Sequence, residues 1–152
     1  MRDQEDQLLL EASCKDFAFR RLTPEDYHKG YIEALSFLTQ VGEVSYEDFL
    51  KRYNEIFPQH QDIYKMLVIH DEHKGKVIGC GSLICEKKFI RQLGTAGHIE
   101  DIVVSEEYRG KKLGLRLIEL LKELAVLNGC YKTILDCEDK NVKFYEKVSI
   151  LM

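Results

Sequence analysis

The chain has 152 residues, a formal net charge of −4, and 45% hydrophobic and 32% charged residues. This length suits a single domain with a real hydrophobic core. The negative charge and the lack of long Lys/Arg runs argue against nucleic-acid binding, and no apolar stretch is long enough to span a membrane. The acidic N-terminus does not resemble a secretory signal.

The cysteines and histidines indicate neither disulfides nor a metal site. The five cysteines have no CxxC spacing, and the five histidines are scattered along the chain. We interpret the thiols as small packed side chains in the cytoplasm or another reducing intracellular compartment. No metal cofactor is therefore expected.

The N-terminal sequence predicts a short arm that precedes the domain. Residues 1–15 are expected to form a loose arm or a short helix, and residues 16–152 the domain itself. Apolar and basic side chains alternate over residues 17–22, which is typical of a half-buried strand.

Two helices are predicted next. Thr23 and Asp26 have the spacing of a capping box, so a helix is expected to begin here and to continue until Gly42. A second capping signal at Ser45 opens another amphipathic helix, which ends before Pro58.

The middle of the chain is rich in β-prone runs. Residues 64–70 and 77–85 predict a hairpin with a glycine in its turn. Residues 88–93 predict a further β-run that residues 94–97 break, and residues 98–104 predict the next strand.

The last part predicts a β-α-β unit. Leucines at helical spacing over residues 113–127 form a strong helix pattern, which ends at Gly129. Residues 130–136 predict a strand parallel to residues 98–104, and Asn141 is expected to cap a short helix. The predicted fold is α/β, with a mixed, mostly antiparallel sheet flanked by helices.

The loop over residues 109–114 has the features of an anion site. Glycines let the main chain approach a ligand closely, and a helix N-terminus attracts negative charge. Arg109, Lys111 and Lys112 add full positive charges. Neither a Walker loop nor G-x-G-x-x-G is present. A pyrophosphate is the expected ligand, and the alternative is a basic turn that caps an ordinary helix.

This hexapeptide resembles the acetyl-CoA loop of the GNAT superfamily of N-acetyltransferases, Q/R-x-x-G-x-G/A, with Lys112 in place of the central glycine. Three further blocks extend the resemblance to the eukaryotic glucosamine-6-phosphate N-acetyltransferases. They cover residues 97–104, 129–137 and 141–147, and the whole resemblance spans residues 17–147.

The resemblance implies the GNAT fold with a parallel β-α-β unit that binds acetyl-CoA. It also implies a homodimer that transfers acetyl from acetyl-CoA to the amine of glucosamine 6-phosphate. The transfer would be direct, within a ternary complex, on the route to UDP-N-acetylglucosamine.

The resemblance also assigns roles to individual residues. Asp136 corresponds to the acid that contacts the attacking amine, and Tyr145 to the tyrosine that faces the CoA sulfur. The residues implied at the sugar are Thr39, Glu100, Asp101 and Asp136. Lys88 is the basic residue predicted to bind the sugar phosphate, with Lys87 and Arg91 as alternatives. The residues implied at CoA are Ile102, Val103, Val104, Arg109, Gly110, Lys111, Lys112, Leu113, Gly114, Asn141 and Tyr145.

These roles have structural alternatives. Asp136 can simply begin a loop, Tyr145 can pack in the core, and Asn141 can only cap its helix. Adjacent carboxylates on a strand point to opposite sides, so only one of Glu100 and Asp101 is expected to reach the sugar directly.

His98 and Cys137 have chemistry suited to catalysis, but we interpret both as structural. After Lys147 the sequence departs from the family, and residues 148–152 are expected to leave the family's last strand shortened or absent. The alternative functions are acetylation of another amine or of a protein lysine, and a non-catalytic acyl-CoA-binding module.

Overall fold

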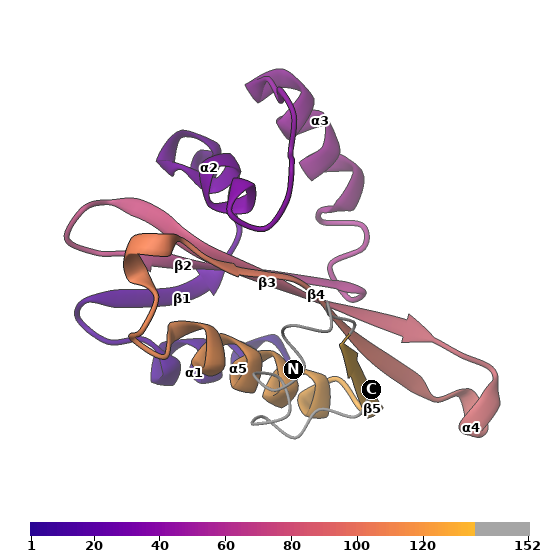
Figure 1. Cartoon of the computed structure of the whole chain (residues 1–152). Coiled ribbons are helices and arrows are strands. Elements are labelled where there is room, and N and C mark those ends of the chain that lie inside the picture. The colour runs from indigo at the N-terminus through magenta and orange to yellow at the C-terminus, as the bar shows by residue number, and fades with distance from the viewer. Residues whose placement is uncertain (136–152) are drawn as a thin grey trace.

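The computed structural model describes residues 1–135 of the 152-residue chain. In this part a five-stranded sheet lies between two helical layers (Figure 1). In chain order the elements are α1 (Arg2–Ala12), β1 (Phe17–Arg21), the 3₁₀ helix η1 (Pro24–Lys29), α2 (Tyr31–Ser36), α3 (Tyr46–Ile56), β2 (Tyr64–Asp71), β3 (Lys76–Lys87), α4 (Ile90–Leu93), β4 (Thr95–Val104), the 3₁₀ helix η2 (Glu106–Tyr108), α5 (Leu113–Leu127) and β5 (Cys130–Leu135).

The strands follow one another across the sheet in chain order, β1-β2-β3-β4-β5. The first four are antiparallel, and β5 runs parallel to β4. This confirms the predicted mixed, mostly antiparallel α/β sheet with one parallel β-α-β unit. No helix among residues 1–135 has both the length and the apolar character needed to cross a membrane.

Each face of the sheet has its own core, because side chains alternate between the two faces of a strand. Helices α1 and α5 cover one face, and α2 and α3 cover the other (Figure 1). The buried core residues on the α5 side include Leu67, Ile69 and Leu121. Those on the α2 side include Val68 and Phe49. Both layers therefore hold the sheet in place without covering its ends.

The single helix predicted from Thr23 to Gly42 is wrong. The capping signal itself is confirmed, since the Asp26 carboxylate accepts a hydrogen bond from the Thr23 N–H at 2.8 Å. Gly30 then adopts a φ of 93°, which ends η1 and begins α2. A left-handed glycine ends a helix readily, so two short helices replace the long one.

The predicted β-run over residues 88–93 is also wrong. Strands β3 and β4 form one hairpin that closes with Lys87 opposite Thr95. Between them, residues 91–93 have φ values of 58°, 57° and 63° and form a left-handed turn. Residues 95–97, which were expected to interrupt a strand, instead begin β4.

Of the two alternatives for the N-terminus, the structure shows the helix. Helix α1 places Leu9 in the core beside α5. Its buried Glu5 carboxylate contacts Arg21 at 2.9 Å and Lys65 at 3.1 Å, and it accepts a hydrogen bond from Asn128 at 2.9 Å. One side chain thus joins α1 to β1, β2 and the end of α5. The domain boundary at residue 15 stays a prediction.

We expect Glu5 to stabilise the fold in a pH-dependent way. Burial alone would raise the pKa of Glu5, but hydrogen bonds from Asn128, Arg21 and Lys65 outweigh burial and hold it below the ordinary value of 4.5. A pKa lowered by folding gives stability above the unfolded pKa, and this stability is lost as the pH falls through the folded pKa. Glu5→Gln should therefore cost about 2 kcal/mol of unfolding free energy at neutral pH, and the difference from the wild type should shrink below pH 4.5.

Urea unfolding at a series of pH values measures this difference. Glu11 lies on the same helix, is exposed and accepts a hydrogen bond from the exposed Gln7 side chain at 2.9 Å. Glu11→Gln is therefore the matched control, with an expected change below about 0.5 kcal/mol. Equal unfolding free energies for Glu5→Gln and the wild type at neutral pH would contradict the role of Glu5.

Candidate active site

A bulge interrupts β4 in the middle of the sheet. Glu100 lies opposite Ser82 of β3, but Val103 lies opposite Cys80, so β4 has one extra residue at this point. Asp101 takes a φ of 53°, a left-handed conformation that aspartate tolerates better than most residues. Strict alternation fails at such a bulge, and both Glu100 and Asp101 are exposed. Both carboxylates therefore stay candidates for contact with a sugar.

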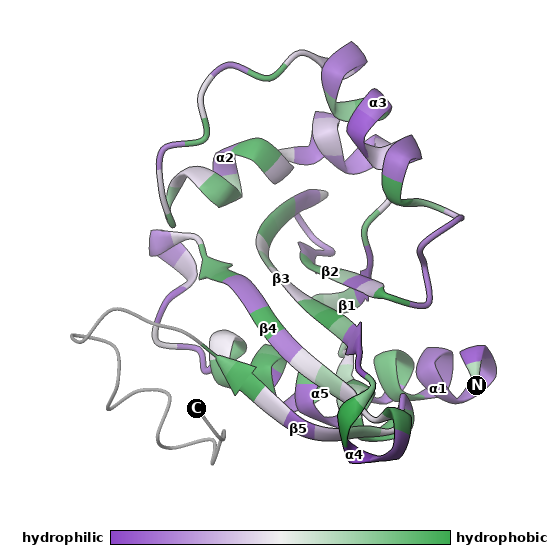
Figure 2. Cartoon of the chain, turned by 90° about the vertical axis from the view of Figure 1, so that its right-hand side faces the viewer, coloured by the Kyte–Doolittle hydropathy of each residue, from purple (hydrophilic) through white to green (hydrophobic). Residues whose placement is uncertain are grey.

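Within residues 1–135, β5 pairs with β4 up to Ile99, just before the bulge. Their parallel pairing begins with Thr95 opposite Cys130 and ends with Ile99 opposite Leu135 (Figure 2). The partner of Ile134 is His98, so the predicted parallel pairing of these two strands is confirmed. Beyond Ile99, no strand within residues 1–135 pairs with the outer edge of β4.

This open edge presents main-chain hydrogen-bonding groups. The N–H of Ser105 donates to the carbonyl of Ile78 in β3 at 2.7 Å. N–H groups alternate in direction along a strand, so those of Ile102 and Val104 point away from β3, toward the open edge. Such groups need partners, and the amide groups of a pantetheine arm can supply them.

The loop after β4 contains two residues in the left-handed conformation. Gly110 has a φ of 87° and Lys112 a φ of 62°. Lys112 occupies the central-glycine position of the GNAT pattern and keeps a glycine-like conformation. Helix α5 begins at Leu113. The N–H of Arg116 donates to the Lys112 carbonyl at 3.1 Å. The N–H groups of residues 113–115 have no partner within the helix and are available to an anion.

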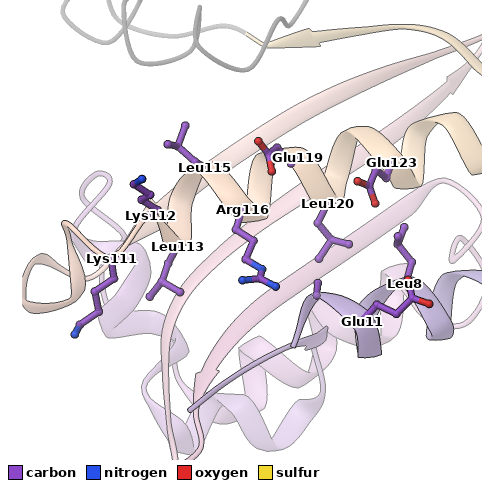
Figure 3. A pocket seen from close by; sticks show the side chains of 11 residues that line it. Leu8, Glu11, Lys111, Lys112, Leu113, Leu115, Arg116, Glu119, Leu120 and Glu123 are labelled. Atoms are coloured by element: carbon purple, nitrogen blue, oxygen red, sulfur yellow. The ribbon is translucent and has the colours of Figure 1, made fainter. Parts of the chain in front are cut away.

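Basic side chains flank this helix N-terminus on two sides. A groove of about 750 Å³ lies between α1 and α5 beside the loop (Figure 3). Lys111 and Arg116 extend toward the α1 side, whereas Lys112 and Leu115 point the other way. Arg116 was not among the residues predicted at CoA, although it lies in the first turn of α5 and is exposed.

Lys88 lies far along β3 from Glu100, another residue predicted at the sugar. Thr39 is exposed in the segment between α2 and α3, and Lys88 follows β3 at the closed end of the β3–β4 hairpin. Glu100 pairs with Ser82, which puts Lys88 on the order of 20 Å from it along β3. The catalytic candidates Asp136 and Tyr145, and also Asn141 and Cys137, lie outside the described residues.

His98 belongs to a surface network beside Lys88. Its Nε2 lies 2.8 Å from Glu86, and the same carboxylate lies 3.2 Å from the Lys88 amine. Hydrogen bonds from His98 and then from Lys88 lower the pKa of Glu86. This arrangement supports the structural interpretation of His98. Within residues 1–135, no group of three or more His, Cys, Asp and Glu side chains is placed to hold a metal ion.

The open edge of β4 and the basic glycine loop together are the features expected of an acyl-CoA site of the acetyltransferase type. The model of the Acetyltransferase (GNAT) family matches residues 25–149. The chain therefore belongs to the GNAT family of acetyltransferases, as its resemblance predicted.

Individual relatives of the chain have more specific descriptions than the family model. The chain is 53% identical over 130 residues to glucosamine 6-phosphate N-acetyltransferase 1 of Dictyostelium discoideum, covering 86% of this chain and 82% of that protein. It is 46% identical over 134 residues to glucosamine 6-phosphate N-acetyltransferase of Arabidopsis thaliana, with coverages of 88% and 89%. The crystal structure of glucosamine-6-phosphate N-acetyltransferase from Arabidopsis thaliana matches with a TM-score of 0.85 at 44% identity, over 90% of this chain and 92% of that one.

We expect the conformation of Gly110 to matter for CoA. Space is open around a Cβ at Gly110, but its φ of 87° is strained for any side chain. Gly110→Ala should therefore cost about 1 kcal/mol of stability and, because the loop shifts to relieve the strain, should weaken CoA binding about three- to tenfold. Calorimetric titration with CoA measures the affinity.

Gly129 is the matched control, since it also has open space and a positive φ, of 74°, but lies at the far end of α5. Gly129→Ala should lower stability by a similar amount and leave CoA affinity unchanged. Equal CoA affinities for both variants would contradict the proposed use of the loop.

Proposed function

We propose that this chain transfers the acetyl group of acetyl-CoA to the amine of glucosamine 6-phosphate, giving N-acetylglucosamine 6-phosphate and free CoA. The observation that carries the proposal is the junction of an unpaired β4 edge with a basic loop at the N-terminus of α5. Identity of 53% to a glucosamine 6-phosphate N-acetyltransferase supports the choice of acceptor. The product serves the synthesis of UDP-N-acetylglucosamine.

Acetyl-CoA is proposed to lie along β4 toward the loop. Its pyrophosphate would accept hydrogen bonds from the free N–H groups of residues 113–115, with Arg109 and the loop lysines as counter-charges. Its pantetheine arm would add to the open edge at Ile102 and Val104 in the manner of a short extra strand. This arrangement would deliver the thioester to the bulge in β4.

The chemistry needs a neutral amine, a stabilised oxyanion and a protonated leaving group. The amine nitrogen attacks the thioester carbonyl, the carbon–nitrogen bond forms, and the carbon–sulfur bond breaks. Asp136, the residue that follows β5 in sequence, is proposed to orient the amine and assist loss of its proton. A main-chain N–H of the β4 edge would stabilise the oxyanion, and Tyr145 would donate a proton to the departing thiolate.

The geometry also supports a homodimer. Lys88 is too far from Glu100 along β3 to meet the same sugar within one chain, so a second copy would have to supply it. The turn beyond Lys88 exposes apolar side chains, with Phe89 92%, Ile90 62% and Leu93 72% exposed. An apolar patch of this kind at a hairpin tip suits burial against a partner subunit.

Acetyl transfer is tested by following thiol release from acetyl-CoA with glucosamine 6-phosphate and with glucosamine. We expect release with the phosphorylated sugar and at least about tenfold less with glucosamine, because a buried or paired phosphate contributes charge-assisted hydrogen bonds. Asp136→Asn and Tyr145→Phe should lower kcat about 100-fold or more without weakening CoA binding.

Release with neither sugar, despite measurable CoA binding, would move the assignment to another amine, a protein lysine or a non-catalytic acyl-CoA-binding module. Unchanged turnover in both variants would show that Asp136 and Tyr145 have been given the wrong roles.

The dimer is tested at the exposed turn. Phe89→Ser should raise the dissociation constant of the dimer about tenfold, as measured by sedimentation equilibrium, and should raise the KM for glucosamine 6-phosphate in parallel. Val126 on α5 is 75% exposed and lies away from this turn, so Val126→Ser is the control and should change neither quantity. A wild-type monomer at all concentrations would contradict the dimer.

A further inference from the structure

A buried hydrogen bond ties the start of the phosphate loop to a distant turn. The Tyr108 hydroxyl donates to one oxygen of the Asp71 carboxylate at 2.6 Å, and the two residues are only 6% and 5% exposed. The other carboxylate oxygen accepts the N–H groups of His73 at 2.9 Å and Lys74 at 3.1 Å. Asp71 therefore closes the turn between β2 and β3 and holds Tyr108 at the same time.

The Tyr108 ring is fixed by further contacts. Phe17 packs edge-on against it, with 6.0 Å between ring centroids. The Lys74 and Lys76 amines lie 5.7 Å and 5.6 Å from the ring centroid, and Lys76 also pairs with Glu107 at 2.8 Å. The segment just before the loop is thus clamped to the β2–β3 turn through charge, ring packing and a buried hydroxyl.

The clamp ends where the ligand-binding loop begins. Arg109 follows Tyr108 directly, is exposed, and donates through Nε to the Val104 carbonyl at 3.3 Å. The loop over residues 109–112 is exposed. An exposed loop can present its N–H groups in a fixed geometry only if its ends are held, and α5 holds the other end.

We propose that Tyr108 and Asp71 are positioning residues for acetyl-CoA. Their hydrogen bond holds the strand-side end of the loop so that its N–H groups are already arranged for the pyrophosphate. Arranging a site before binding lowers the ordering cost of binding. This inference rests on the proposed function, in which the loop binds CoA.

The ionisation of the pair keeps the bond intact near neutral pH. Burial, and then the bond to Asp71, raise the pKa of Tyr108 to about 12. The Tyr108 hydroxyl, followed by the turn N–H groups, lowers the pKa of Asp71. Tyrosine therefore stays the donor and aspartate the acceptor wherever acetyl transfer is measured.

The test compares Tyr108→Phe with Tyr53→Phe. Tyr53 also loses a hydroxyl hydrogen bond in this substitution, to the Leu22 carbonyl at 3.4 Å, but lies on α3. Tyr108→Phe should raise the Kd for CoA and the KM for acetyl-CoA about three- to tenfold, with kcat within about twofold of the wild type. Tyr53→Phe should leave both constants unchanged.

A shortened cosubstrate separates positioning from general damage. S-acetylpantetheine carries the thioester but no pyrophosphate, so Tyr108→Phe should use it as well as the wild type does. At Asp71, an asparagine keeps a carbonyl acceptor for the Tyr108 hydroxyl, so Asp71→Asn should retain tighter CoA binding than Asp71→Ala.

The inference is overturned if Tyr108→Phe lowers only the melting temperature and leaves the Kd for CoA unchanged. It is also overturned if acetyl-CoA and S-acetylpantetheine lose activity equally. If the wild type binds CoA but does not acetylate glucosamine 6-phosphate, the proposed function fails, while the Kd comparison still decides the role of Tyr108. A wild type that binds no CoA overturns both.

Discussion

The site depends on the bulge that Asp101 places in β4. Without it, β4 would continue its regular pairing with β3. With it, Glu100 and Asp101 are both exposed, and within residues 1–135 no strand pairs with the outer edge of β4 beyond Ile99. Unpaired strand edges usually promote aggregation. Here the edge leads directly into the basic loop, so a ligand with amide groups and a pyrophosphate matches both features at once. A single left-handed residue therefore marks the part of β4 at which we propose that the thioester lies.

Around this opening, a few buried polar groups fix the surrounding elements. Glu5 joins α1 to the sheet and to the end of α5, and Asp71 joins the β2–β3 turn to the loop before α5. On the opposite face, Asp26 is buried and receives two hydrogen bonds from Arg20, at 2.9 Å and 2.7 Å. Glu5 and Asp71 connect segments that are far apart in sequence, whereas Asp26 joins η1 to the nearby strand β1. The apolar cores supply most of the stability, whereas these groups specify which elements lie side by side.

Local patterns were sufficient for most of the fold and for the position of the loop. The leucine stripe of α5, the capping signal at Ser45 and the β2–β3 hairpin depend on neighbours in sequence, and the structure confirms them. The errors have other causes. Gly30 can continue or end a helix, and only packing on β3 decides which. The left-handed turn over residues 91–93 uses side chains that favour strands. The bulge depends on pairing with β3, so no local pattern could place Glu100 and Asp101. The interpretation of Asp136 and Tyr145 came from family resemblance and stays a prediction.

Lys112 has a consequence for how the protein responds to ionic strength. In a GNAT loop with glycine at this position, the main chain supplies the anion site and no charge is added. Here a lysine takes the left-handed conformation at some cost in strain, and it points to the side opposite Lys111 and Arg116 (Figure 3). The ligand phosphates would then lie between exposed cations, whose attraction is screened as salt increases. Cosubstrate binding should accordingly be more sensitive to salt in this chain than in a relative that keeps the glycine. The acetyl-CoA concentration that saturates the site would then rise more steeply with salt concentration in this chain.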